Sequence, residues 1–208
     1  EYVNAGLSGT PSNLGVLRLQ RDVLDYTPDI VFVEFAVNDS QDDIAKESYE
    51  SLVKTVLEQD NAPAVVLLFN TTATGYTAQK HMKEIGEYYD LPMISAADAL
   101  TVEFDEGRMT WKDYSNDQSH PNAVGHELLC EFIANMYTSA ENSEDSGEYV
   151  IPTMPKFGAS YVNAAMLTPE TESDRITVTE TGSFGPVQSG PAGFPCSWKY
   201  NGGNEPLK

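Results

Sequence analysis

DIVFVEFA, residues Asp29 to Ala36, is an apolar run that leads directly into Val37-Asn38-Asp39. The run is short and rich in β-branched residues, as is typical of a strand buried on both faces of a parallel sheet. A second run of the same kind, AVVLLFN, occupies Ala64 to Asn70. Between them Ile44–Leu57 repeats apolar residues at helical spacing, and the three segments together predict a right-handed βαβ unit.

Further elements of both kinds are expected on either side of this unit. Apolar residues recur at helical spacing before and after it, and Pro121 suits the first turn of the last helix. Strands that alternate with helices predict an α/β fold, a three-layer α/β/α sandwich around a parallel sheet. The additional helices are expected over Leu14–Leu24, Thr77–Tyr89 and Val124–Met136, and the additional strands at Tyr2–Asn4 and Pro92–Ser95.

The character of the sequence changes near residue 140. Residues 1–139 carry the α/β pattern, and residues 140–149, which begin AENSEDSGE, read as an acidic linker. Beyond the linker the helical spacing disappears, and Gly, Pro and Ser clusters surround short runs such as RITVT at Arg175–Thr179. Residues 150–208 are therefore expected to be part of a β-rich module.

Composition argues against several classes of partner. The formal net charge is −20, from 12 basic and 32 acidic residues; nucleic acid and anionic membranes both need a basic patch. No apolar run approaches the length of about 20 residues that spans a bilayer. Cys130 and Cys196 form no disulfide framework, and His126 with Cys130 lacks a third metal ligand, so neither metal nor cofactor is expected. The oligomeric state and the compartment stay open, with a secreted or cell-surface location favoured over the cytoplasm.

Three polar clusters are candidates for a site: Ser8-Gly9-Thr10, Val37-Asn38-Asp39 and Asp117-Gln118-Ser119-His120. They fall at or near the carboxyl ends of the expected strands, where an open parallel sheet binds its ligands. Asp117 lies three residues before His120, so within one turn its carboxylate can accept a hydrogen bond from the ring Nδ1–H. That would leave Nε2 free as a general base. The alternative is that Asp117 caps the turn and His120 is a surface residue.

Asn38 and Gly9 are candidates for binding an oxyanion. Asn38 ends an apolar strand, and its amide can donate into a cleft, although an Asx turn would explain it as well. Gly9 has no Cβ, so its backbone N–H can approach a ligand closely, or it permits a tight turn. Ser8 does not fit the nucleophile elbow G-x-S-x-G, because position 10 is threonine. Ser8 is therefore expected to cap the next helix or to line the loop.

NAGLSGT, VEFAVND and DQSHPNAVGH, in this order, resemble the motif blocks of the SGNH hydrolases, the GDSL-like esterase and lipase superfamily. The resemblance covers Glu1 to about Tyr137. It implies a flavodoxin-like sandwich around a parallel sheet and ester hydrolysis through an acyl-enzyme. It also implies that the Gly9 N–H and the Asn38 side chain form the oxyanion hole, and that His120 is the base oriented by Asp117.

The resemblance lacks the family's first block. The nucleophilic serine of the family lies in a GDS-like block well ahead of the block that contains Gly9, and this chain starts only a few residues before Gly9. The serine and its strand, the first of the fold, are therefore expected upstream in a longer protein, and the 208 residues are expected to be inactive alone. The β-rich tail resembles C-terminal extensions of multidomain bacterial members that act on decorated polysaccharides. It implies a small ester or an acylated carbohydrate, acetyl above all, as substrate.

Two alternative functions stay open. An O-acyltransferase would use the same site and pass the acyl group to a sugar hydroxyl instead of water. A catalytically silent carbohydrate-binding or scaffold module is the other alternative, because the serine is missing and an extra β-region is present.

Overall fold

The computed structural model describes residues 1–144, 147–170, 177–188, 194 and 196–208. These residues form two compact units. Gly9–Ala164 make up one, called here the α/β unit, and Glu1–Ser8 with Ala165–Lys208 make up the other. In the described ranges there is no helix with the length and apolar character that crossing a membrane requires.

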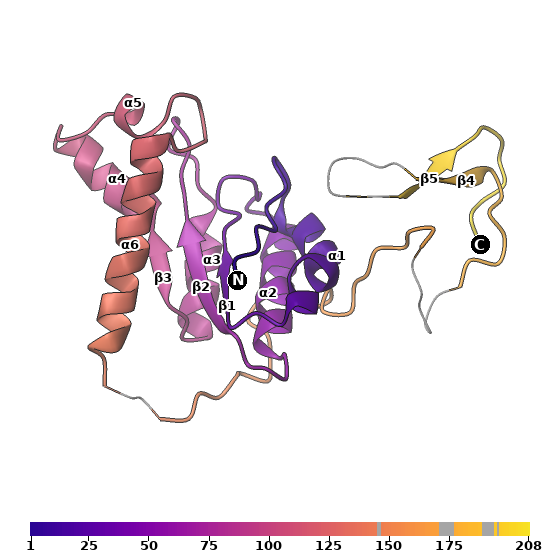
Figure 1. Cartoon of the computed structure of the whole chain (residues 1–208), viewed down its shortest axis with the longest axis horizontal. Coiled ribbons are helices and arrows are strands. Elements are labelled where there is room, and N and C mark those ends of the chain that lie inside the picture. Colours follow the sequence, from indigo (N-terminus) through magenta and orange to yellow (C-terminus); the bar gives the residue numbers. More distant parts are fainter. Residues whose placement is uncertain (145–146, 171–176, 189–193, 195) are drawn as a thin grey trace. The chain divides into compact units, whose positions relative to one another are not determined.

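The α/β unit alternates helices and strands along most of its length (Figure 1). Its strands are β1 (Ile30–Val33), β2 (Ala64–Phe69) and β3 (Met93–Ser95). Its helices are α1 (Ser12–Asp22), the 3-10 helix η1 (Leu24–Tyr26), α2 (Asp43–Leu57), α3 (Gln79–Tyr88), α4 (Ala96–Asp105), α5 (Trp111–Tyr114) and α6 (Ala123–Glu141).

The strands form one parallel sheet in the order β1-β2-β3. Helices α1, α2 and α3 lie on one face of it, and α4 and α6 lie on the other (Figure 1). Side chains alternate between these faces along β2, as strand geometry requires: Leu67 packs with the α1–α3 layer and Leu68 with α4 and α6. The expected α/β sandwich with a parallel sheet is confirmed.

A close contact places the start of α1 beside the end of β1. A Cβ at Gly15 would lie 2.5 Å from the ring of Phe35, which follows β1. Only glycine lets the helix approach this ring so closely. The two polar segments that precede α1 and follow β1 are therefore brought to the same edge of the sheet.

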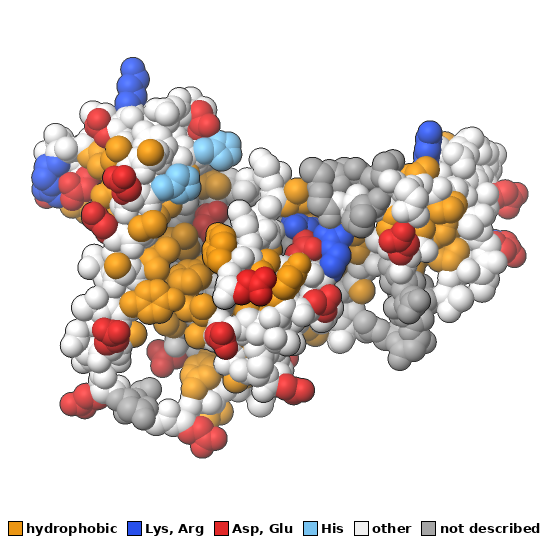
Figure 2. Space-filling view, viewed as in Figure 1, with side chains coloured by type: hydrophobic (Ala, Val, Ile, Leu, Met, Phe, Trp, Pro, Cys, Tyr) orange, Lys and Arg blue, Asp and Glu red, His pale blue; other side chains and the backbone are white. Residues whose placement is uncertain are grey.

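The face of the sheet on which α4 and α6 lie is covered unevenly. Leu68 of β2 packs with α4 and α6, whereas Phe32 of β1 is 38% exposed. Figure 2 shows hydrophobic side chains gathered on the surface beside α6. Among the described residues β1 pairs with β2 alone, so its other edge keeps unpaired N–H and C=O groups.

Some expected elements differ from the observed ones. Tyr2–Asn4 is not a strand: Tyr2 is 87% exposed and the segment joins no ladder of described residues, and a lone extended segment leaves its backbone groups unpaired. Helices α4 and α5 were not expected. The N-cap of α4 is Ser95, whose hydroxyl accepts the N–H of Asp98 at 3.0 Å, so β3 turns directly into a helix.

Residues Tyr149–Tyr161, called here the strap, pack on α2 and α3. The carboxylate of Glu50 on α2 is fully buried and accepts the N–H groups of Phe157 and Gly158, at 2.6 Å and 3.0 Å. The hydroxyl of Tyr89 donates to the same carboxylate at 2.8 Å. Because of these bonds the α/β unit extends to Ala164, beyond the domain end expected at residue 139. Residues 145–146 of the expected linker lie outside the described residues.

The second unit contains a small antiparallel sheet. Its strands are β4 (Phe184–Val187) and β5 (Ser197–Tyr200), and Phe184 pairs with Tyr200. Of the strand expected at Arg175–Thr179, residues 175–176 lie outside the described residues, and 177–179 form no strand.

Candidate active site

Polar loops follow β1 and β2 at one edge of the sheet, the edge where such folds bind ligands. Asp39, in the loop after β1, is 1% exposed, and its Oδ1 accepts the N–H of Ser12 at 2.6 Å. Ser12 is the first residue of α1, and its hydroxyl lies 3.0 Å from that of Ser48 on α2. The start of α1 and the loop that carries Asn38 are thus joined by hydrogen bonds.

Residues 71–78, the loop after β2, bridge two of the predicted clusters. The hydroxyl of Tyr76 donates to the backbone carbonyl of Asp39. The N–H of Ala73 donates to the carbonyl of Gln118 at 2.9 Å. One loop therefore contacts the Asn38–Asp39 segment on one side and the Asp117–His120 segment on the other.

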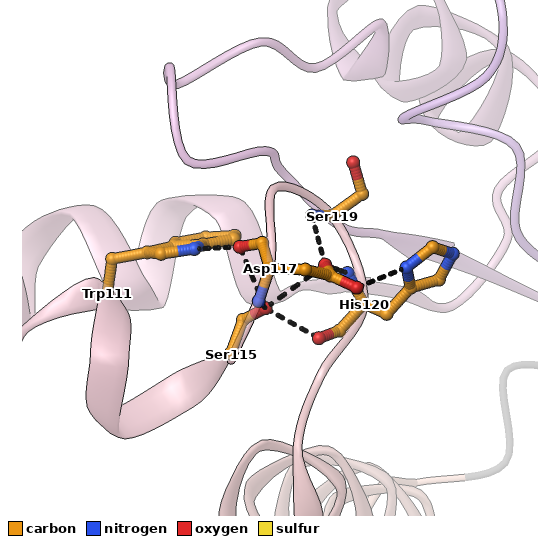
Figure 3. A network of polar contacts seen from close by, with 5 residues as sticks. All are labelled: Trp111, Ser115, Asp117, Ser119 and His120. Carbon is orange, nitrogen blue, oxygen red and sulfur yellow. Dashed lines mark hydrogen bonds and ion pairs between the residues drawn. The ribbon is translucent and has the colours of Figure 1, made fainter.

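Asp117 and His120 form the hydrogen-bonded pair that their spacing predicts (Figure 3). Nδ1 of His120 lies 2.8 Å from Oδ2 of Asp117. Oδ1 of Asp117 accepts the backbone N–H groups of Ser119 and His120, each at 2.8 Å. The two interpretations of Asp117, as a cap of the turn and as a partner of the ring, therefore describe a single geometry.

The environment of Asp117 keeps this carboxylate charged. The N–H of His120 first, then the N–H of Ser119 and the His120 side chain, hold the pKa of Asp117 well below its usual range. An ionised carboxylate at Nδ1 fixes the ring proton there. The His120 side chain is 75% exposed, and within the described residues nothing bonds Nε2, so this nitrogen is available to take up a proton.

Ser115 holds the loop together, although its part in the site was not expected. Its hydroxyl donates to the carbonyl of His120 at 2.6 Å and accepts the N–H of Asp117 at 3.1 Å. Trp111 adds a bond from its ring N–H to the carbonyl of Asp117, at 2.6 Å (Figure 3). A serine two residues before an aspartate favours a local turn, and this was the available signal.

The group of Asn38 that can donate to a ligand is its side-chain amide and not its backbone N–H. The backbone N–H already donates to the carbonyl of Phe35 at 3.0 Å. The side chain is exposed and has no hydrogen bond with any described residue. The side-chain amide is therefore the group that can donate to a ligand at this position. A cavity of about 270 Å³ opens here, lined by Asn38, Asp39, Ser40, Ser12, Asn13 and Ser48 among others.

Gly9 has the left-handed backbone that glycine adopts without strain. Its φ is +69° and no atom lies within 4 Å of where a Cβ would be. No hydrogen bond among the described residues joins Gly9 to Asn38 or His120. Of the two roles expected for Ser8, the helix cap is wrong, because Pro11 occupies the N-cap of α1 and Asp39 accepts the N–H of Ser12. Ser8 lies in the turn before α1, as the other expected role requires.

Two carboxyl groups lie beneath the loops, Glu34 partly buried and Asp39 buried, and neither was predicted from the sequence. Burial raises the pKa of Glu34 to about 7, against the lowering effect of the N–H groups of Ala36 and Asn70. Burial likewise raises the pKa of Asp39 to about 6, although Ser12 bonds it. The signal for Glu34 was an acidic residue inside an otherwise apolar run of sequence.

Metal binding has no visible support in the described part of the chain. No group of three or more His, Cys, Asp or Glu side chains converges there as a metal site would need. His126 and Cys130 are both exposed on α6.

The order of the polar loops and the sheet they follow also appear in known proteins. The sequence profile of the GDSL-like lipase/acylhydrolase family matches residues 1–128. The chain belongs to this family. The match includes Gly9, Asn38, Asp117 and His120, and the resemblance seen in the motif blocks is thereby confirmed at the level of the family. None of the curated proteins matches the sequence.

Solved structures of esterases share the fold of this GDSL-like chain. A two-domain esterase (CEX) active on acetylated mannans is 35% identical, with a TM-score of 0.68. The match covers 74% of this chain but only 42% of that esterase. The same esterase co-crystallised with mannopentaose gives 34% identity, a TM-score of 0.67 and the same coverage. A variant of Axe2, an acetyl-xylooligosaccharide esterase from Geobacillus stearothermophilus, shares the fold at 18% identity and a TM-score of 0.55, over 63% of this chain and 69% of that one.

Proposed function

We propose that this chain is part of a serine esterase that removes acetyl groups from a carbohydrate through an acyl-enzyme. The observation that carries the proposal is the pair formed by Asp117 and His120. The carboxylate lies 2.8 Å from Nδ1, and Nε2 has no partner among the described residues. A histidine oriented in this way is suited to take a proton from a hydroxyl and return it to a leaving group.

Each side chain then has a defined part in the reaction. Nε2 of His120 takes the proton of the serine hydroxyl while the serine oxygen bonds to the ester carbon. The carbonyl oxygen becomes an oxyanion, and the Gly9 N–H and the Asn38 side chain donate to it. Collapse of this intermediate breaks the bond to the sugar oxygen, which takes the proton from His120. Water then gives a proton to His120 while its oxygen bonds to the acyl carbon. The bond to the serine oxygen breaks, the serine oxygen takes the proton from His120, and acetate leaves.

The nucleophilic serine in this proposal comes from polypeptide other than residues 1–208. Two observations in the α/β unit support this. The outer edge of β1 has no partner among the described residues, and Phe32 beside it is 38% exposed. A further parallel strand at that edge would pair the free backbone groups, and the polar loop after it would reach the same edge as Asn38.

The proposed substrate class is supported by the esterase with the higher identity. That protein is active on acetylated mannans, and it shares 35% identity with 74% of this chain. The cavity beside Asn38 is lined by hydroxyl, amide and carboxylate groups that can bond the hydroxyls of a sugar, and also by the apolar side chains of Pro11, Ile44 and Ala45. We therefore favour an acetylated oligosaccharide over a lipid ester.

The deciding experiment uses the natural polypeptide that contains both these residues and the serine, called here the serine-containing protein. Release of acetate from acetylated mannan is measured for the wild type and for His120→Ala. The wild type is expected to be active, and the variant to lose turnover by about 10³-fold or more with unchanged unfolding temperature. Full turnover in the variant would refute the role of His120.

Three further measurements separate the alternatives. Residues 1–208 alone are expected to release no acetate, and activity abolished by Ser8→Ala would contradict this. Product analysis with an acceptor sugar distinguishes hydrolysis from acyl transfer, since free acetate is the expected product. Binding of the polysaccharide without any turnover by the serine-containing protein would instead indicate a silent binding module.

A further inference from the structure

We infer that Tyr76 is a positioning residue that fixes the Asn38–Asp39 segment and the Asp117–His120 segment relative to each other. The inference rests on the proposed function for its meaning, because these segments carry the proposed oxyanion donor and the proposed base. Three links carry it, and each is a hydrogen bond between identified atoms in or beside residues 71–78, the loop after β2.

The first link runs from the side chain of Tyr76 to the Asn38–Asp39 segment. The Tyr76 hydroxyl donates to the backbone carbonyl of Asp39. The backbone N–H of Asp39 donates to the carbonyl of Phe35 at 2.9 Å, and its Oδ1 accepts the N–H of Ser12 at 2.6 Å. The Asp39 backbone is thus already held on the sides of β1 and α1. The tyrosine adds a bond on the side of β2.

The second link lies within the loop after β2 and joins the backbone of Tyr76 to Thr72. The carbonyl of Tyr76 accepts the N–H of Thr72 at 3.0 Å, and its N–H donates to Oγ1 of Thr72 at 3.1 Å. The N–H of Gly75 donates to the carbonyl of Thr72 at 2.9 Å. These bonds close the loop into one turn, so a displacement of Tyr76 also moves Thr72 and the residue after it, Ala73.

The third link joins this turn to the Asp117–His120 segment. The N–H of Ala73 donates to the carbonyl of Gln118 at 2.9 Å. Gln118 lies directly between Asp117 and Ser119, inside the turn that Oδ1 of Asp117 closes by accepting the N–H of Ser119. Because the bond joins two backbones, it cannot be kept by a change of side-chain rotamer when the loop moves. The position of Tyr76 therefore bears on the turn that carries His120.

The exposure of Tyr76 argues against a role in packing alone. Its side chain is 40% exposed, so a large part of the ring buries no apolar surface. A phenylalanine would fill the same space and lose only the hydroxyl. The bond to the carbonyl of Asp39 is what the hydroxyl provides. Tyr76→Phe consequently removes the first link and leaves the ring in place.

The test compares Tyr76→Phe with Tyr88→Phe in residues 1–208. Tyr88 is the matched control, because it is 38% exposed and its hydroxyl also donates to a backbone carbonyl, that of Met154 in the strap, at 2.8 Å. Hydrogen exchange of the Ala73 amide is measured by NMR, with the amide of Val53 in α2 as reference. The chemical shifts of the His120 ring are recorded in the same samples.

We expect Tyr76→Phe to speed exchange at Ala73 by about fivefold to tenfold, the effect of one hydrogen bond of ordinary net strength, and to move the His120 ring resonances. Thr72→Val removes the acceptor of the Tyr76 N–H and should act in the same direction. The double variant should fall short of the product of the single effects, because both changes break one path. Tyr88→Phe should leave both readouts unchanged.

Unchanged exchange at Ala73 and unchanged ring shifts of His120 in Tyr76→Phe would overturn the inference, as would fully multiplicative effects in the double variant. These readouts need no turnover. An inactive wild type would therefore refute the esterase proposal and leave the result for Tyr76 standing.

The serine-containing protein provides a second readout that a merely structural role would not move. Tyr76→Phe is expected to lower kcat on acetylated mannan by about tenfold with little change in KM, and Tyr88→Phe to change neither. The unfolding temperatures of the two variants should be similar. A rise in KM with unchanged kcat would show that Tyr76 contacts the substrate, and it would contradict a positioning role.

Discussion

Asp117 contacts His120 twice, through Oδ2 to the ring Nδ1 and through Oδ1 to the backbone N–H, each at 2.8 Å. One carboxylate therefore fixes both the direction of the ring and the conformation of the residue that carries it. The same charge lies 55% exposed, so water reaches it, and the N–H groups rather than burial keep it ionised. The proposed base thus depends on Asp117 both for its orientation and for the position of its ring proton.

Asp117→Asn is expected to lower kcat of the serine-containing protein by about 10³-fold to 10⁴-fold. The amide oxygen can still accept the backbone bonds, but a neutral amide cannot stabilise the imidazolium that forms when His120 takes a proton. The matched control is Asp113→Asn, because Asp113 also accepts a backbone N–H in this region, that of Thr110, and has no contact with His120. Similar losses in the two variants would contradict the assignment.

Asn38→Ala should lower kcat by about 10²-fold to 10³-fold, the usual cost of removing one oxyanion donor. The side chain is exposed and has no hydrogen bond within the described residues, so the unfolding temperature should stay the same. Activity is compared on acetylated mannan and on a small acetyl ester. A loss restricted to the polysaccharide would show that Asn38 binds the sugar instead of the oxyanion.

Gly9→Ala places a side chain at a φ of +69°, which costs about 1 kcal/mol of strain or forces the backbone to turn. Gly107→Ala is the matched control, because Gly107 has a φ of +67° and equally open space for a Cβ. Both variants should lose similar stability in thermal unfolding. Only Gly9→Ala should also lose turnover, since its N–H is the one proposed to meet the oxyanion; equal turnover in both would remove Gly9 from the site.

The stability that Glu34 and Asp39 contribute to the α/β unit should fall as pH rises from about 4 to about 7. Glu34 and Asp39 hold their protons more tightly in the folded chain, with pKa values of about 7 and about 6. In this window the unfolded chain binds fewer protons than the folded chain, so raising the pH favours unfolding. Denaturant unfolding at a series of pH values measures the slope.

Glu34→Gln removes one of these two groups and should make the slope smaller. A pKa raised from 4.5 to about 7 corresponds to about 3 kcal/mol at most. The variant and the wild type should differ in slope only within this window. Parallel curves for the two proteins across the whole range would contradict the raised pKa of Glu34.

Much of the fold follows from local patterns in the sequence. The run at Asp29–Ala36 is apolar and β-branched, and Ile30–Val33 within it form β1. Only Val31 and Val33 are buried, while Phe32 on the other face is 38% exposed, so the expected burial on both faces is not observed. The helix at α4 was missed because Ala96–Asp105 follows a strand of three residues without a break, and only the Ser95 cap marks its start. Tyr2–Asn4 has the composition of a strand but no described partner.

The candidate site could be predicted where its residues are close together in the sequence. Asp117 and His120 are three residues apart, and one turn brings them together, so their contact could be read from spacing. Asn70 and Tyr114 are far apart in the sequence, and the 2.6 Å hydrogen bond between their side chains depends on how the segment after β2 packs against α5. No pattern within either segment contains that packing, which is why the bond between Asn70 and Tyr114 could not be predicted.

The hydrogen bonds between the strap and α2 determine how the α/β unit bears tension on the chain. Tension applied to the chain beyond Ala164 is carried first by the hydrogen bonds of Tyr161 to Ser51 and of Ser160 to Glu47. The bonds between Glu50 and the backbone of Phe157 and Gly158 follow. These bonds load α2, while α6, which follows directly from the His120 loop, lies on the other side of the anchor along the chain. Glu47, Glu50 and Ser51 of α2 thus anchor the strap together, so that pulling on the C-terminal residues leaves the proposed base in place until these bonds break.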